Sequence, residues 1–128
     1  MTALEKAVLI VEDEYLISLG LSAQIQDMGL SVCATADTAD AAVTQARMHR
    51  PAIILMDVRL KGERDGVDAA LAIHDSVGSK IIFITGSREQ KTIERISQGH
   101  PFATLFKPIS DRQLQAAVND AIQAAGQA

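Results

Sequence analysis

Four short apolar runs of the chain each end in polar residues suited to phosphate or metal chemistry. The runs are 8–11, 53–56, 81–84 and 103–106, and the residues that follow them are Glu12 with Asp13, Asp57, Thr85 and Lys107. Continuous apolar runs of this length are typical of strands buried on both faces of a parallel sheet, and such sheets bind ligands at the carboxyl ends of their strands. We therefore expect three carboxylates, a hydroxyl and an ammonium group to meet at one edge of a sheet.

Three neighbouring carboxylates would repel one another unless a cation lay among them. Mg²⁺ is a hard cation that takes oxygen ligands, typically one or two carboxylates together with water and a phosphate, and it accompanies the transfer of phosphoryl groups. Lys107 would supply a positive charge for one phosphate oxygen, and Thr85 a hydroxyl donor for another. If Asp57 is the nucleophile, its phosphorylated form finds compensating groups nearby. The pattern therefore predicts a phosphoryl acceptor with Mg²⁺ as cofactor.

Segments of helical period separate the apolar runs. The predicted helices are Tyr15–Met28, Thr38–His49, Gly66–Val77, roughly Arg88–Ser97, and a fifth with its apolar stripe from Leu114 to Ile122 and a cap at Ser110 or Asp111; Ser31–Ala36 is a less apolar strand. Five strand–helix units predict an α/β fold, a flavodoxin-like doubly wound five-stranded parallel sheet of order 2-1-3-4-5 with five helices. The second and fifth strands are the least apolar and are expected at the edges.

Length and composition set the outer bounds of the fold. The chain has 128 residues, 48% of them hydrophobic, and no apolar run that approaches the ~18 residues of a membrane span. We expect a single domain over residues 1–128, with no output domain. The segment Met1–Lys6 carries Glu5 and precedes a short apolar run, so we expect neither a signal peptide nor a membrane anchor, and a cytoplasmic location.

Charge restricts the class of partner. The formal net charge is −4 at neutral pH, whereas proteins that bind nucleic acid directly usually carry a basic surface. We therefore expect no nucleic-acid and no membrane partner. Proteins and small anions remain as the expected partners.

Over almost its whole length the chain resembles the receiver domain of bacterial two-component response regulators. The residues that carry the resemblance are the acidic pair after the first strand, Asp57 after the third, Thr85 after the fourth, and Lys107-Pro108 after the fifth. One of these residues alone would be weak support for the resemblance, but the whole set at matching spacings is specific for receiver domains.

The resemblance implies a role for each site residue. Asp57 is the expected phospho-acceptor. Asp13 is an expected ligand of Mg²⁺, Glu12 is expected to act through water, and the backbone carbonyl of Arg59 is the expected third protein ligand. Thr85 then corresponds to the switch hydroxyl and Lys107 to the lysine that pairs with the phosphate. The Lys107–Pro108 peptide bond is expected to be cis.

Three departures from the common receiver pattern point to a subgroup. Most receivers have Tyr or Phe three residues before the lysine, where the ring turns inward upon phosphorylation, but this chain has Thr104. The segment 83–86 reads Phe-Ile-Thr-Gly, similar to the Phe-Ala-Thr-Gly signature of an atypical subgroup that works with histidine kinases of the HWE or a related type. The loop 58–66 is one residue longer than usual and has Lys61 where many receivers have Pro.

The expected function is that of a single-domain response regulator. A sensor histidine kinase, of HWE type by the subgroup resemblance, or a phosphotransfer protein donates a phosphoryl group to Asp57. The domain then signals to a downstream protein target by phosphorylation-dependent contacts, or serves as a phosphate sink or shuttle. We expect no enzymatic activity beyond its own phosphorylation and dephosphorylation, and a monomer or weak dimer.

Two other classes fit the residues less well. A Mg²⁺-dependent phosphatase with an aspartyl nucleophile usually needs a second acid two residues after the nucleophile, and Arg59 stands there. A pseudo-receiver that only binds partners is disfavoured because the chain keeps every phosphorylation residue. In receivers the residues two after the acceptor and two after the switch residue flank the path of the attacking water; here these are Arg59 and Ser87.

Several other residues are expected to be structural. His49, His74 and His100 are scattered over different elements without metal-ligand spacing. Cys33 lies in a predicted strand, where a small buried hydrophobic role is expected. Phe83 and Phe106 are interpreted as core residues.

Overall fold

The computed structural model describes residues 7–126, a parallel sheet with helices on both faces. In this part of the chain the elements are β1 (Ala7–Val11), α1 (Tyr15–Asp27), β2 (Ser31–Ala36), α2 (Ala39–His49), β3 (Ile53–Asp57), α3 (Gly66–Ser76), β4 (Lys80–Thr85), α4 (Gln90–Ser97), β5 (Ala103–Phe106) and α5 (Asp111–Gly126). The strands are ordered β2-β1-β3-β4-β5 and pair in parallel, as predicted for the flavodoxin-like sheet. The prediction for Met1–Lys6 lies outside the described residues.

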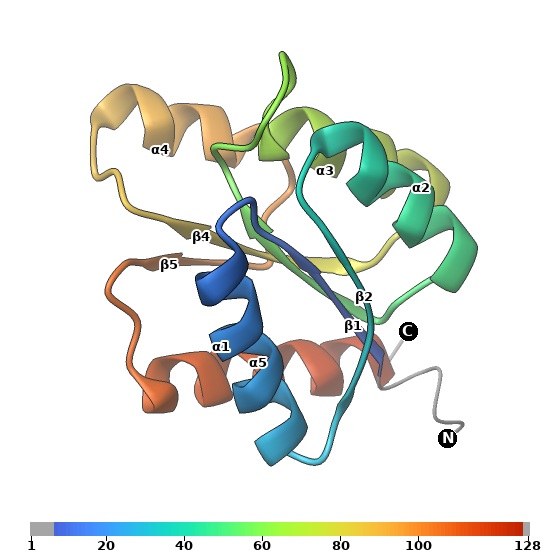
Figure 1. The fold of residues 1–128 in the computed structure, drawn as a ribbon. Coiled ribbons are helices and arrows are strands. Elements are labelled where there is room, and N and C mark those ends of the chain that lie inside the picture. Colours follow the sequence, from blue (N-terminus) through green and yellow to red (C-terminus); the bar gives the residue numbers. More distant parts are fainter. Residues whose placement is uncertain (1–6, 127–128) are drawn as a thin grey trace.

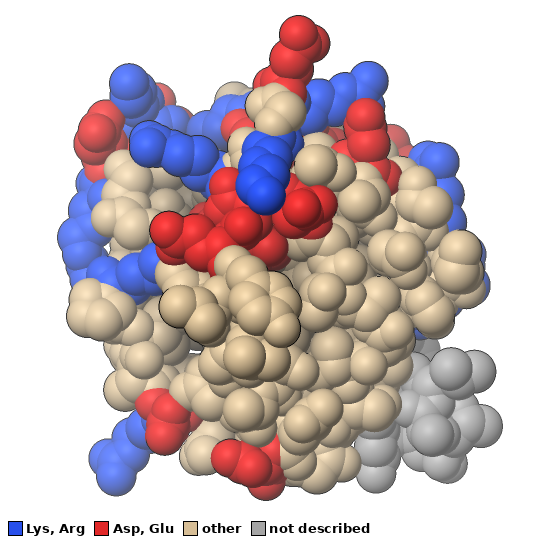
Figure 2. Space-filling model, in the orientation of Figure 1, with Lys and Arg blue, Asp and Glu red and all other residues tan. Residues whose placement is uncertain are grey.

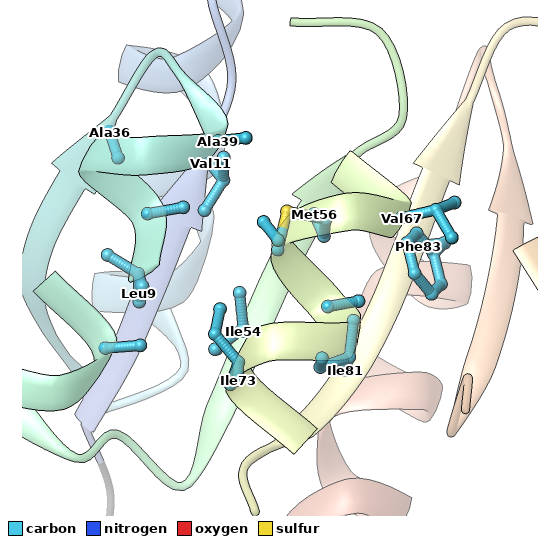
Figure 3. Close-up of a cluster of buried hydrophobic side chains, with 14 of the residues drawn as sticks. Leu9, Val11, Ala36, Ala39, Ile54, Met56, Val67, Ile73, Ile81 and Phe83 are labelled. Carbon is cyan, nitrogen blue, oxygen red and sulfur yellow. The ribbon is translucent and has the colours of Figure 1, made fainter. Parts of the chain in front are cut away.

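Two layers of helices cover the sheet (Figure 1). Helices α1 and α5 lie on one face, and α2, α3 and α4 lie on the other. Successive strand residues point to opposite faces, so Leu9, Ile54 and Phe83 join one hydrophobic cluster, which Figure 3 shows, while Ile10, Leu55 and Ile82 join the other. All residues of β1 and β3 are buried, which confirms that the apolar runs 8–11 and 53–56 form buried strands. The run 103–106 instead forms edge strand β5, whose residues are only half-buried.

Local signals fix the ends of several helices. Thr38 caps α2, because its Oγ1 accepts a hydrogen bond from the Ala41 N–H at 3.0 Å. Arg50 ends α2 with a left-handed φ of 46° just before Pro51, where the sequence predicts the stop. Ser110, one of the two predicted caps of α5, accepts a hydrogen bond from the Gln113 N–H at 3.1 Å.

Helix α4 begins at Gln90, two residues later than the predicted start near Arg88. The residues before it form a turn through side-chain hydrogen bonds instead of a helix. The Ser87 N–H donates to Thr85 Oγ1 at 3.1 Å, and the Glu89 N–H donates to Ser87 Oγ at 3.2 Å. Short hydroxyl side chains that bond the local backbone in this way compete with helix formation.

The structure corrects two of the residue assignments. Phe83 is fully buried as predicted, but Phe106 is only half-buried, and the Arg88 guanidinium lies 4.3 Å from the centre of its ring. The edge position of β5 explains the difference, because one side of an edge strand lacks a neighbour. Cys33 is also half-buried, on edge strand β2, and its Sγ lies 3.5 Å from the Val8 carbonyl oxygen.

The histidines are less scattered than their sequence positions indicate. The rings of His74, on α3, and His100, in the loop before β5, stack with centroids 3.8 Å apart and planes 8° apart. Within residues 7–126, no histidine belongs to a cluster able to hold a metal ion. None of the helices in this part of the chain is long and apolar enough to cross a membrane.

Candidate functional site

The carboxyl ends of the parallel strands bring the predicted site residues to one edge of the sheet. The strand register places Val11 beside Met56, Asp57 beside Ile84, and Thr85 beside Phe106. The polar residues at or after these positions therefore meet although they lie far apart in sequence. They line a cavity of about 510 Å³ whose walls are Asp13, Glu14, Asp57, Val58, Arg59, Thr85, Gly86, Ser87, Thr92 and Lys107.

Acidic side chains dominate the surface at this edge of the sheet. Figure 2 shows Asp and Glu side chains gathered where β1 leads into α1, with Lys and Arg side chains beside them. Glu12 and Asp57 are buried, whereas Asp13 is half-buried and faces the cavity. The site is therefore an acidic pocket with a solvent-accessible mouth.

Lys107 is the cation at the centre of this site. Its Nζ lies 3.2 Å from Glu12 Oε1 and 3.4 Å from Asp57 Oδ2, so a single ammonium group contacts two carboxylates. The cis peptide bond between Lys107 and Pro108 is present, as expected from the resemblance. The Lys107 N–H also donates to the Thr85 carbonyl oxygen at 2.8 Å, which ties the start of the β5–α5 loop to the end of β4.

Asp57 lies in an environment that disfavours its charged form. Burial raises the pKa of Asp57, the negative charge of Glu12 raises it further, and Lys107 only partly offsets both, so that its pKa is about 7. Burial also acts to raise the pKa of Glu12, but hydrogen bonds from the Glu14 N–H and Asp57, together with Lys107, hold it below the usual range. The buried pair therefore shares its negative charge unequally, and the protonated form is favoured on Asp57 rather than on Glu12.

The acidic residues fit a divalent cation of the Mg²⁺ class. Each of Glu12, Asp13 and Asp57 offers a carboxylate oxygen within 4.8 Å of those of the other two. Oxygen ligands of this kind are those that Mg²⁺ prefers, and a cation there would relieve the repulsion that raises the pKa of Asp57. Arg59, whose carbonyl the resemblance implies as a further ligand, lines the same cavity.

Thr85 belongs to a short chain of hydroxyl groups. It is buried at the end of β4 and accepts a hydrogen bond from the Ser87 N–H. The Ser87 hydroxyl in turn donates to Thr92 Oγ1, in the first turn of α4, at 3.2 Å. The sequence indicated Thr85 and Ser87 but not Thr92, although a hydroxyl residue one turn into a polar helix that follows Thr-Gly-Ser was a usable signal.

The loop that follows Asp57 returns closely to it. The Gly66 N–H donates to the Val58 carbonyl oxygen at 2.7 Å, and a Cβ atom at position 66 would overlap the Asp57 carbonyl oxygen. Glycine is therefore required there by close backbone approach. This contact fixes the first residue of α3 against the backbone of the predicted acceptor.

Comparison with known proteins identifies the family to which this fold belongs. The chain belongs to the response regulator receiver domain family, whose sequence model matches residues 8–119. This is a family of signalling domains whose acidic pocket binds Mg²⁺.

Two curated relatives and one solved structure illustrate the relationship. The transcriptional regulatory protein PdtaR of Mycobacterium tuberculosis is 32% identical over 94% of this chain, and the phyllosphere-induced regulator PhyR of Methylorubrum extorquens is 32% identical over 90%. The chain spans 58% of the length of PdtaR and 43% of that of PhyR. The receiver domain of a modulated diguanylate cyclase from Desulfovibrio desulfuricans has a TM-score of 0.89 and 34% identity, covering 96% of this chain and 98% of that one.

Proposed function

We propose that this chain is a phosphorylatable receiver in which Asp57 accepts a phosphoryl group from a phosphohistidine of a sensor histidine kinase or a phosphotransfer protein. The observation that carries the proposal is the position of Asp57. It is a buried carboxylate between Lys107, the acidic residues that follow β1, and the hydroxyl of Thr85. The signal then passes to a downstream protein through contacts that depend on phosphorylation.

The transfer is a displacement at phosphorus. An Asp57 carboxylate oxygen forms a bond to phosphorus while the phosphorus–nitrogen bond of the donor breaks, and the electron pair stays with the imidazole nitrogen, which takes a proton. The product is an acyl phosphate on Asp57. Mg²⁺ held by Asp13, Asp57 and Glu12 would neutralise charge on the phosphoryl oxygens.

This chain's own residues supply the remaining steps. Asp57 attacks as the carboxylate, and Mg²⁺ beside Glu12 and Asp13 would favour this charged form over the protonated one. Lys107 already lies 3.4 Å from Asp57 Oδ2, so its ammonium group is placed to pair with an oxygen of the bound phosphoryl group. The Thr85 hydroxyl has its own proton free to donate, since the Ser87 N–H uses only its acceptor side.

The sequence of β4 and residue 104 in β5 support a proposal for the type of kinase. The segment Phe83-Ile84-Thr85-Gly86 and the absence of an aromatic residue at position 104 resemble the receiver subgroup that works with HWE or related histidine kinases. We therefore include a kinase of that type in the proposal. Incubation of the chain with purified kinases of this and of other types, with labelled ATP, would measure the preference.

The acceptor assignment is tested by replacing Asp57 with Asn. This variant keeps the shape of the side chain but removes the nucleophile, so it should fold and take up no phosphoryl group from acetyl phosphate or from a kinase, as measured by intact mass and phosphate-affinity gels. Asp120→Asn, which changes an exposed carboxylate on α5, is the matched control and should be phosphorylated like the wild type. Full phosphorylation of folded Asp57→Asn would overturn the proposal.

A further inference from the structure

Helix α4 is attached to the molecule mainly by polar contacts. Within α4, which lies wholly in the described part of the chain, only Ile96 is buried, and Ile93 remains 39% exposed. A helix with so few apolar contacts gains little stability from packing. Its position must therefore depend on the hydrogen bonds and ion pairs at its two ends.

At its C-terminal end α4 is held by a forked contact, which we call the Arg95 clamp. Arg95 Nε donates to Asp65 Oδ2 at 3.2 Å, and its Nη2 donates to Asp65 Oδ1 at 3.0 Å and to Asp68 Oδ1 at 2.8 Å. The three side chains are each only about a third exposed. Planar bidentate contacts of this kind are stronger and more specific than ordinary surface ion pairs.

The two carboxylates of the clamp also form the start of α3. Asp65 Oδ1 accepts a hydrogen bond from the Asp68 N–H, and Asp68 Oδ2 accepts one from the Asp65 N–H, both at 2.9 Å. This reciprocal capping box fixes the geometry of the first turn. Gly66, the residue after Asp65, lies against the carbonyl group of Asp57. The clamp therefore joins α4 to the loop that begins at the acceptor.

The N-terminal end of α4 is joined to the other side of the acceptor. Thr92 accepts the hydrogen bond from Ser87, whose N–H donates to Thr85. Helix α4 thus bridges the two loops that border the cavity, with the hydroxyl chain at one end and the Arg95 clamp at the other.

We propose that Arg95 is a positioning residue that couples the acceptor loop, residues 58–65, to α4 and through α4 to Thr85. This inference rests on the proposed function, because it assigns Arg95 a part in organising the site that binds the phosphoryl group. With the clamp in place the loop is already ordered when the phosphoryl group binds. Without it, binding must also order the loop, and that entropy loss weakens the affinity.

Amide hydrogen exchange tests the coupling without any phosphoryl chemistry. In Arg95→Gln we expect faster exchange in both α4 and residues 58–65, with unchanged exchange in the central strands. Lys91→Gln removes a positive charge from the same helix but only an exposed pair with Glu89, and it should exchange like the wild type. Faster exchange in α4 alone would show that the clamp does not reach the acceptor loop and would overturn the inference.

Binding of beryllofluoride with Mg²⁺, a phosphoryl mimic, tests the effect on the site. Arg95→Gln should weaken this binding about fivefold or more, the range of typical coupling between sites. Arg95→Lys keeps the charge but not the fork, so it should fall between the wild type and the Gln variant. Lys91→Gln should bind normally.

The outcomes separate this inference from the proposed function. If the wild type binds beryllofluoride and Arg95→Gln binds it equally well, the inference is wrong and the receiver function stands. If the wild type does not bind it, the proposed function fails, and the exchange experiment alone decides whether Arg95 couples the two segments. Full affinity in Arg95→Lys would exclude the forked geometry as the cause and would also overturn the inference.

Discussion

Asp57, Glu12 and Lys107 form a group in which each charge depends on the others. Two carboxylates are buried beside one ammonium group, and Lys107 only partly offsets the effect of burial and of Glu12 on Asp57. Burial of Asp57 and the negative charge of Glu12 raise the pKa of Asp57 to about 7. A cluster of carboxylate oxygens of this kind is suited to bind a divalent cation.

The stability of the protein without Mg²⁺ should depend on pH through Asp57. Between its ordinary pKa of 3.8 and about 7, the folded chain holds a proton on Asp57 that the unfolded chain has released. The contribution of this protonation to the free energy of unfolding is complete at pH values below the ordinary pKa of aspartate, and it is lost as the pH rises through about 7. We therefore expect the free energy of unfolding to decrease by about 2–3 kcal/mol between about pH 5 and about pH 8, relative to Asp57→Asn.

Urea denaturation in EDTA, of the wild type and of Asp57→Asn at each pH, measures this difference. The variant serves as the reference because it keeps the other titrating groups. A difference in stability between the two proteins that stays constant over this pH range would contradict the assigned protonation of Asp57.

The lifetime of the phosphorylated form should be set by Arg59 and Ser87. Both line the cavity beside Asp57, and neither carries a carboxylate or carboxamide that would orient an attacking water. We expect slow loss of the phosphoryl group, measured by phosphate release after removal of the donor. Arg59→Asn introduces a carboxamide and should shorten the lifetime of the phosphorylated form several-fold. Loss of the phosphoryl group from the wild type within seconds at neutral pH would contradict the expectation.

Among the elements, α4 and the loop before it are the part most able to change position. The central strands are buried on both faces, while α4 contributes one buried side chain and is held at its ends by hydrogen bonds. Segments with few apolar contacts open at low free energy. Thr85 leads directly into this segment, so a movement of its hydroxyl changes the hydrogen bond from Ser87 and then the one to Thr92.

Addition of beryllofluoride and Mg²⁺ should therefore change amide exchange over residues 86–100, together with the exposed faces of β5 and α5, more than over α1 or α2. The physical reason is that Thr85, drawn toward the bound group, displaces the loop and α4, since Thr104 supplies no ring to transmit the change through β5. Exchange followed by mass spectrometry with and without the mimic measures it, and Asp57→Asn is the control. Identical exchange over 86–100 together with a change in another helix would place the signal on a different face.

At the scale of the whole molecule, the site is a local source of instability that a cation should remove. Glu12 and Asp13 follow β1, and Asp57 ends β3, the strand that pairs with β1, so their repulsion acts at the end of this central strand pair. A ligand that binds only the folded state stabilises it by mass action.

Millimolar Mg²⁺ should consequently raise the melting temperature at neutral pH. Asp13→Ala should reduce this increase, because it removes a ligand that faces the cavity. Differential scanning calorimetry of both proteins with and without Mg²⁺ provides the measurement, with Asp120→Asn as a variant that should respond like the wild type. An unchanged melting temperature in the wild type would mean that the acidic cluster does not bind the metal.

Much of the fold, and the meeting of the predicted site residues at one edge of the sheet, follow from the sequence alone. Apolar runs such as Ile53–Met56 predict strands, and the parallel order follows from helices that alternate with them. Because the carboxyl ends of parallel strands share one edge, the sequence predicts that residues as distant as Glu12 and Lys107 lie close together. These inferences depend only on local periodicity and on rules of chain topology.

Only the tertiary structure decided how the side chains pair within that frame. The contact of Lys107 with Glu12, the raised pKa of Asp57, the half-buried ring of Phe106 and the stack of His74 on His100 all depend on distances between elements. The Arg95 clamp depends on the position of α4 beside the start of α3. The pattern of apolar residues in a sequence shows whether a segment is a helix or a strand. It does not show which polar side chains of different elements meet. That depends on how the helices and strands pack, because packing decides which polar groups become partners and which are buried away from water.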